Sequence, residues 1–268
     1  MSEYSIIFAI ILGIVEGITE FIPVSSTAHL LLMNLILGIK SPGGDSFVIL
    51  VQLGAVSALI YAYFNRIIII LRSIPYDPAA RRFMIALFLG FLPAAIFGLL
   101  SHNFIKSILF KETIIMYVTL IVGGIILWVV DRVKWKSRYF DIQNYPISIA
   151  LKIGLFQCFA MIPGTSRSGA TIVGALILGA DKRSATDFSF FLAIPTIIGA
   201  CSLDFYKNRD IIMDNIGFEI IIGCIASFIT GLIVVRSLLN FISRQGYAPF
   251  ALWRVLIGVI GLLFETVF

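Results

Sequence analysis

Nine consecutive residues, 163–171, with the sequence PGTSRSGAT, place an arginine among hydroxyl and glycine residues inside an apolar chain. A charged group at membrane depth is costly and is usually functional. The guanidinium of Arg167 presents several N–H donors in one plane. The serine and threonine hydroxyls, and the backbone amides at the start of the next apolar run, are further hydrogen-bond donors. This set suits an anion, most naturally phosphate. The candidate phosphate-binding residues of this segment are Gly164, Ser166, Ser168, Gly169 and Thr171, with Arg167 as the catalytic cation. The structural alternative is a polar turn in which the arginine pairs with a carboxylate.

A second polar segment, 13–29, reads GIVEGITEFIPVSSTAH. Its Glu16 and Glu20 are four residues apart, so both carboxylates fall on one face of a helix, about one turn apart. Like charges so close need a cation. Arg167 could supply it, but carboxylates that face phosphate oxygens also suit a hard divalent ion such as magnesium or calcium. The alternative is a pair of acids that lines a water-filled or proton-conducting cavity.

The same segment carries Ser26 and His29, three residues apart at the head of the helix that is expected after Pro23. A serine nucleophile with a histidine base fits this spacing, and so does a histidine acid that serves a leaving group. Ser25 and Thr27 add hydroxyls that could bind phosphate. A plainer reading keeps His29 as a hydrogen-bonded packing residue and the hydroxyls as helix caps.

The two polar segments read alike. Each begins with a glycine in an apolar run, carries Glu16 or Gln157 three residues later, and breaks at an Ile-Pro pair before a hydroxyl-rich turn. We interpret this as an internal duplication, with repeats at about 1–135 and 140–268.

Composition places the chain in a membrane. Hydrophobic residues make up 59% of the 268 positions and charged residues 13%, and the mean hydropathy is strongly positive. No polar stretch is long enough for a separate soluble domain, so 1–268 is expected to form one integral membrane domain. The net charge of +5 is explained by basic residues beside membrane spans, and no basic-aromatic patch indicates nucleic acid.

Six apolar runs are long enough to cross a bilayer as helices. They are 47–64, 82–100, 114–130, 186–203, 218–235 and 251–268. The remaining runs, 4–21 with 27–38 and 148–161 with 169–179, pair around the two polar segments and read as re-entrant helical hairpins. The sequence therefore predicts an all-α polytopic membrane protein with six crossing helices and two re-entrant hairpins. Three crossings per half would make the repeat an inverted-topology one.

The loops predict the orientation. One side of this topology carries twelve basic residues: Arg66, Arg72, Arg81, Arg82, Arg132, Lys134, Lys136, Arg138, Lys182, Arg183, Arg236 and Arg244. The other side carries five: Lys40, Lys106, Lys111, Lys207 and Arg209. The positive-inside rule puts the first set in the cytoplasm and both termini outside, so that the hairpin tips meet near mid-membrane. Asp187, Asp204 and Arg254 lie near predicted span ends, where they are expected to extend toward the interface.

Together, segments 16–29 and 163–171 strongly resemble the undecaprenyl-diphosphate phosphatase family, also called the bacitracin-resistance family. The likeness covers nearly the whole chain. It implies an enzyme of the cell (inner) membrane that hydrolyses undecaprenyl diphosphate to the monophosphate carrier lipid of cell-wall synthesis. It also implies a divalent-metal requirement and a site that opens to the periplasm. One departure is Ala28, where the family commonly has glycine.

The resemblance assigns roles residue by residue. The family's acidic motif falls on Glu16 and Glu20, its hydroxyl-histidine pair on Ser26 and His29, and its phosphate-binding motif on Ser166, Arg167, Ser168 and Thr171. The expected partners are a polyprenyl diphosphate lipid and the bilayer, with a homodimer as a candidate assembly. The alternative function is a transporter or flippase for a phosphorylated lipid or small anion, because broken helices around a polar site also build transporters.

Overall fold

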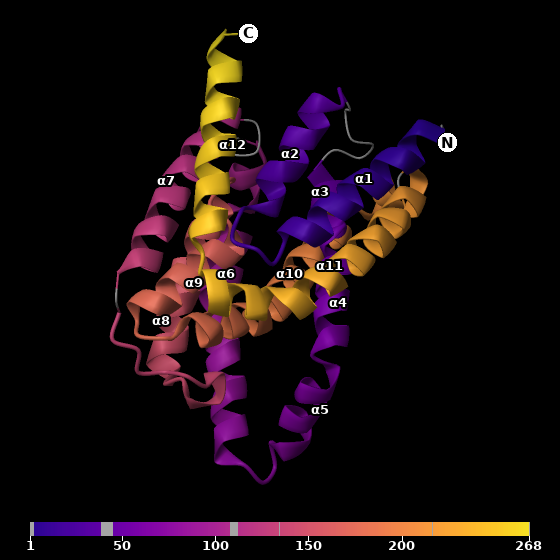
Figure 1. Cartoon of the computed structure of the whole chain (residues 1–268). Helices are drawn as coiled ribbons and strands as arrows, with labels where there is room; N and C mark the ends of the chain where they lie inside the picture. The colour runs from indigo at the N-terminus through magenta and orange to yellow at the C-terminus, as the bar shows by residue number, and fades with distance from the viewer. Residues whose placement is uncertain (1–2, 39–44, 108–111, 134, 216, 268) are drawn as a thin grey trace.

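The computed structural model describes residues 3–38, 45–107, 112–133, 135–215 and 217–267 (Figure 1). Across these ranges the chain is helical, and its β-type pairing is a single bridge between Tyr139 and Ala180. The predicted all-α architecture is confirmed.

The helices fall into two successive series. The first series comprises α1 (Glu3–Thr19), α2 (Ser26–Ile36), α3 (Asp45–Leu50), α4 (Gln52–Ala62), α5 (Phe64–Ser73), α6 (Pro78–Ser107) and α7 (Thr113–Arg132). The second comprises the 3₁₀ turn η2 (Ile142–Asn144), α8 (Ile147–Cys158), the 3₁₀ turn η3 (Phe159–Met161), α9 (Arg167–Ile177), α10 (Lys182–Asn215), α11 (Gly217–Gln245) and α12 (Ala248–Val267).

Five single helices are long and apolar enough to cross a membrane. These spans are Pro78–Ser101, Thr113–Arg132, Lys182–Asp210, Gly217–Gln245 and Ala248–Glu265. A bent pair of helices, 46–62 and 64–73, passes the same test together, with an angle of 68° at the break, and makes a sixth span if the pair crosses as one. The sequence predicted a span at 47–64 and a loop after it. The structure corrects this, because the chain bends at Tyr63 and continues as helix α5.

The bend at Tyr63 has contacts that hold it. Arg66, in the first turn of α5, forms an ion pair with Asp187 of α10 and lies 5.3 Å above the ring of Phe191. Tyr63 packs edge-on against Phe190 and Phe191. The bent segment is thus fixed to α10 by one charge pair and a group of rings.

The two polar segments form the turns of helical hairpins, α1–α2 and α8–α9, as predicted from the breaks in the apolar runs. The hairpins pack across the two series: α1 lies against α11, and α8 lies against α6. A Cβ on Gly13 would meet Gly223 O at 2.3 Å, and one on Gly154 would meet Gly90 O at 2.1 Å. Glycine is required at both crossings, since the helix backbones touch there.

The internal duplication into repeats at about 1–135 and 140–268 stays a prediction. In Figure 1 the start of α1 and the end of α12 lie at the upper end of the molecule, and the α5–α6 connection lies at the lower end. The inverted orientation of the two halves in a membrane stays a prediction.

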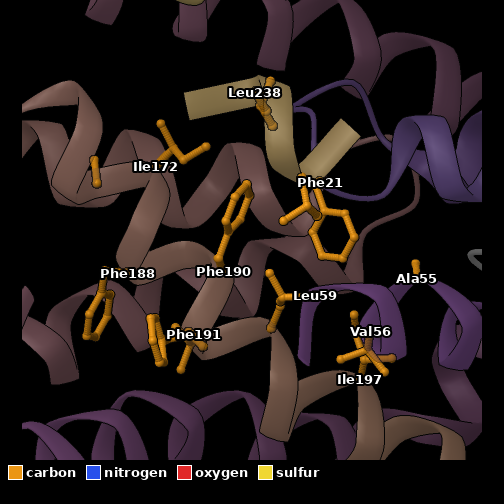
Figure 2. Close-up of a cluster of buried hydrophobic side chains, with 14 of the residues drawn as sticks. Phe21, Ala55, Val56, Leu59, Ile172, Phe188, Phe190, Phe191, Ile197 and Leu238 are labelled. Carbon is orange, nitrogen blue, oxygen red and sulfur yellow. The ribbon is translucent and has the colours of Figure 1, made fainter. Parts of the chain in front are cut away.

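A cluster of buried hydrophobic side chains, phenylalanines among them, includes Phe21 of the first hairpin turn (Figure 2). Phe21, in that turn, is fully buried and meets Phe190 edge-on with ring centroids 5.4 Å apart. Phe190 lies between Phe21 and Ile172 of α9 in this view. Because Phe21 follows Glu20 directly, the packing of its ring fixes the backbone that carries the candidate carboxylate.

Candidate active site

The tips of the two hairpins meet. Nη2 of Arg167 donates a hydrogen bond of 2.9 Å to Oε1 of Glu20, and both side chains are largely buried. The Ser168 hydroxyl donates to the carbonyl of Ile22, 3.1 Å away. The two polar segments therefore form one site, as the sequence analysis expected.

The two turns share an unusual backbone conformation. Ser25 and Ser166 each precede a hairpin's second helix, and both have φ of 72°. Non-glycine residues rarely adopt this region, and holding one there costs about 1–3 kcal/mol. The Ser166 hydroxyl accepts from the amide of Gly169 at 3.1 Å, so it caps α9. The Ser25 side chain makes no such cap on α2.

Arg167 is held from two sides through its Nη1 and Nη2 atoms. Its Nη1 donates to the carbonyl of Ser189 on α10 at 3.0 Å, while Nη2 binds Glu20. The buried Nε has no hydrogen-bond partner among the residues that the structure describes. An unused donor on a buried guanidinium is costly, and a phosphate oxygen would satisfy it.

The hydroxyl residues of the phosphate-binding segment lie directly before α9 and in its first two turns. Ser168 and Ser166 are 3.1 Å apart at their hydroxyls. Thr171 donates back to the carbonyl of Arg167 and contacts the Ser189 hydroxyl at 2.7 Å. These contacts order the turn around Arg167.

Ser26 is paired with Glu20 and not with His29. Its hydroxyl lies 2.5 Å from Oε2 of Glu20. Nδ1 of His29 is hydrogen-bonded to the carbonyl of Ser25, 2.8 Å away. Its Nε2 accepts a hydrogen bond of 2.8 Å from the indole N–H of Trp253. The expected Ser26–His29 pair is therefore wrong for this structure. The reason is that the imidazole turns back along its own helix toward the carbonyl four residues earlier.

Glu16 lies one turn before Glu20 and is fully buried. Neither of its carboxylate oxygens has a hydrogen-bond partner in the described part of the chain. Within the same ranges no group of three or more His, Cys, Asp or Glu side chains could hold a metal by itself. Two carboxylates plus the oxygens of a bound phosphate would still suit a hard divalent ion, so the residues fit the expected cofactor.

Arg254 is a member of this region that the sequence analysis missed. It was expected to extend from the end of its span toward the interface, but its side chain is fully buried. The guanidinium donates to five backbone carbonyls from the two hairpin turns and α7: Pro23, Thr119, Leu120, Gly164 and Thr165. Asp187 and Asp204 are also buried, so the expectation was wrong for all three. An arginine four residues inside an apolar run was the available signal.

A cavity of about 410 Å³ opens beside the hairpin tips. Its lining includes seven of the candidate residues: Glu20, Ser25, Ser26, Thr27, Gly164, Ser166 and Arg167. Four further polar side chains line it as well: Gln52, Gln157, Thr196 and Asp204. Its walls are mostly apolar and small, and come from α6, η3 and α10: Phe91, Ala94, Ala95, Gly98, Leu99, Ala160, Met161, Ile197, Gly199, Ala200 and Leu203. A cavity of this kind suits an amphiphile with an anionic head and a hydrocarbon chain.

Residues 9–260 match the family of bacitracin resistance protein BacA. The chain is 57% identical over 263 residues to undecaprenyl-diphosphatase 1 of Agrobacterium fabrum, a match that covers 98% of each chain. It is 56% identical over 264 residues to the undecaprenyl-diphosphatase of Sinorhizobium medicae, again with 98% of each chain covered. The undecaprenyl-diphosphatase of Cereibacter sphaeroides is 50% identical over 262 residues, which cover 98% of this chain and 97% of that protein.

Proposed function

Because the chain belongs to the bacitracin resistance protein BacA family, we propose that its hairpin junction is where undecaprenyl diphosphate is hydrolysed to undecaprenyl phosphate and inorganic phosphate. The chain is a multi-pass membrane hydrolase of the undecaprenyl-diphosphatase kind, and its activity serves cell-wall synthesis by returning the carrier lipid. The observation that carries the proposed site is the meeting of Glu20, Ser26 and Arg167 in the lining of a mostly apolar cavity.

The cavity matches both parts of a polyprenyl diphosphate. The Nε of Arg167, which has no hydrogen-bond partner among the described residues, points to a site for a terminal phosphate oxygen, and the capped turn of α9 supplies the surrounding hydroxyls. The first isoprene units would lie along the small apolar residues of α6 and α10, because these residues keep the hydrocarbon chain out of water. The longer remainder of the chain would leave the cavity into the bilayer.

We propose Ser26 as the nucleophile and Glu20 as its base. The hydroxyl already donates to Glu20, so this carboxylate can take the proton as Oγ attacks the terminal phosphorus. The new Oγ–P bond forms as the anhydride P–O bond breaks, and undecaprenyl phosphate leaves as the anion. Glu20 passes the proton it took from Ser26 to this departing lipid phosphate, which remains an anion, and becomes a carboxylate again. Water then attacks phosphoserine: Glu20 takes one proton from the water and returns it to Oγ as the Oγ–P bond breaks and inorganic phosphate is released. Arg167 stabilises the charge on the equatorial oxygens in both steps.

The competing mechanism has water attack the terminal phosphorus directly. Ser26 would then only donate a hydrogen bond to the substrate, and Glu20 would take the proton of water. The two routes use the same Arg167 contact and differ in whether a phosphoserine forms.

Magnesium or calcium is proposed as the cofactor, held by Glu16 and shared with Glu20. No hydrogen bond to the two oxygens of Glu16 is formed within the described part of the chain, whereas those of Glu20 bind Ser26 and Arg167. When bound, such an ion would neutralise phosphate charge and orient the diphosphate.

We also propose that the site opens to the periplasmic side and that both termini lie there. The supporting observation is the split of twelve against five basic residues between the two sets of loops.

The decisive experiment is phosphate release by purified protein in detergent, with a polyprenyl diphosphate and magnesium. An enzyme turns over in this setting without a second compartment, whereas a transporter or flippase needs one. Absence of release by a well-folded preparation, together with transport of the same lipid in vesicles, would reject hydrolysis in favour of the alternative.

A further inference from the structure

Trp253 of α12 makes a specific hydrogen bond to His29 of α2. Its indole Nε1 lies 2.8 Å from Nε2 of the imidazole, and the two rings are near parallel, 14° apart in plane with centroids 6.2 Å apart. His29 is buried, whereas 45% of the surface of Trp253 is exposed. The indole therefore covers the imidazole from the outer side of the bundle.

This contact fixes the tautomer of His29. The indole N–H can only donate, so Nε2 must be the accepting nitrogen and Nδ1 must carry the proton. Nδ1 in turn lies 2.8 Å from the carbonyl of Ser25, which can only accept. Both ring nitrogens of a neutral imidazole are thus used, and neither faces the Ser26 hydroxyl, which donates to Glu20.

The carbonyl that His29 holds belongs to the strained residue of the turn. Ser25 has φ of 72°, and its side chain does not cap α2. The hydrogen bond from Nδ1–H of His29 holds the carbonyl of Ser25, in the peptide that directly precedes the proposed nucleophile Ser26. Fixing this peptide fixes the direction of the first turn of α2, and therefore the direction of the Ser26 hydroxyl.

We propose that Trp253 is a positioning residue that keeps His29 neutral with its proton on Nδ1. Held in this way, His29 orients the Ser25–Ser26 turn. It does not accept or donate the proton that is transferred during hydrolysis. The part of this proposal that concerns catalysis rests on the proposed function. The neighbouring Arg254 binds the carbonyl of Pro23 from the same helix, so α12 holds the turn at two points.

Nitrogen NMR tests the tautomer without any reference to activity. The chain has two histidines, His29 and His102, so a His102→Gln parent labelled with ¹⁵N-histidine reports on His29 alone. We expect a protonated Nδ1 and an unprotonated, hydrogen-bonded Nε2. Labelling tryptophan as well should reveal a scalar coupling between the indole nitrogen and Nε2. A protonated Nε2 in the parent, or a coupling that is absent at a resolved Nε2 signal, overturns the proposal.

Variants at position 253 test the positioning role. Trp253→Phe keeps a ring and removes the donor, so the Nε2 resonance should move and kcat should fall about three- to tenfold with little change in KM. Trp253→Tyr keeps a donor and should recover part of the loss. Trp128→Phe is the matched control, because Trp128 lies on α7 with its ring beside Arg132, away from the site. Equal kcat in the two phenylalanine variants overturns the role.

Variants at position 29 separate an orienting histidine from a proton carrier. Asparagine places an amide donor near the position of Nδ1, whereas glutamine places its amide near Nε2. We expect His29→Asn to keep at least about tenfold more kcat than His29→Gln or His29→Ala. Equal loss in all three, with folded protein by size exclusion, overturns the orienting role. Phosphate release by the wild type is measured first, so an inactive wild type would reject the proposed function while the NMR result still decides the tautomer.

Discussion

Glu20 and Arg167 are 147 positions apart in the sequence, and their side chains form a 2.9 Å ion pair across the two hairpin tips. The same carboxylate accepts a hydrogen bond from the Ser26 hydroxyl. One acid therefore links the cation that would hold phosphate to the hydroxyl that would attack it. Any change to one of the three groups should change the position of the other two.

Arg167→Lys keeps the positive charge and loses the planar fork. Lysine cannot bind Glu20, the carbonyl of Ser189 and a phosphate oxygen in one plane, as the three nitrogens of Arg167 can. We expect kcat/KM for phosphate release to fall by about 100-fold or more. Turnover near that of the wild type, at matched purity, would contradict the role assigned to this side chain.

Glu16→Gln should weaken the apparent affinity for the divalent ion, because an amide is a poorer ligand for a hard cation than a carboxylate. Magnesium and calcium titrations of the activity should show a higher half-saturating concentration, and excess metal should restore part of the rate. Glu20→Gln should be rescued less, since Glu20 also binds Ser26 and Arg167. A deficit in Glu16→Gln that no metal concentration changes would remove Glu16 from the metal site.

Much of this architecture follows from the sequence. The apolar runs and the two Ile-Pro breaks predict the hairpins because a helix cannot continue through such a turn, and the shared pattern predicts that the tips meet. The pairing of Ser26 with Glu20 could not be predicted in the same way. It depends on the positive φ of Ser25, a backbone conformation that a serine-rich stretch does not reveal.

The contacts of Arg254 and the bend at Tyr63 could not be predicted from the sequence, for a different reason. A hydropathy pattern describes one helix, whereas the partners of Arg254 are carbonyls in two distant turns and α7. The bend at Tyr63 likewise involves an ion pair between Arg66 and Asp187 of α10. Such pairings are set by packing between elements, so they become visible only with the fold.

Arg254→Met should destabilise the whole bundle. Methionine has a similar length but leaves the carbonyls of Pro23, Gly164 and Thr165 without their donor, and each buried polar group left unsatisfied costs about 1–3 kcal/mol. We expect a clearly lower melting temperature in detergent. Arg209→Gln is the control, because Arg209 is largely exposed. Equal melting temperatures for the two variants would show that Arg254 does not tie the turns together.

Cysteine labelling checks the proposed orientation. In a background without Cys158, Cys201 and Cys224, single cysteines at Arg81 and Lys136 should be shielded from an impermeant thiol reagent in intact cells. A cysteine at Arg209 should react. Permeabilised cells provide the control, because all three positions should then be labelled. The opposite pattern in intact cells would place the termini in the cytoplasm.

Ser26→Ala decides between a serine nucleophile and direct attack by water. A covalent nucleophile cannot be removed without losing nearly all turnover, whereas an accessory hydroxyl is worth roughly 1–3 kcal/mol, or about ten- to a hundredfold in rate. Because Ser26 donates to Glu20, we expect the alanine variant to lose well over a thousandfold in kcat, with folding unchanged. Ser26→Thr, which keeps a hydroxyl, is the matched variant and should retain measurable activity.

A phosphoserine intermediate provides the independent evidence for the same choice. Rapid quenching of wild-type protein with a polyprenyl diphosphate labelled at its terminal phosphate should trap the label on Ser26, since the second step needs a water molecule to reach the phosphoserine. Mass spectrometry of the peptide that contains Ser26 locates it. Alanine-variant activity within about a hundredfold of the wild type, with no label on the chain, would assign the attack to water and leave Ser26 as a hydrogen-bond donor to the substrate.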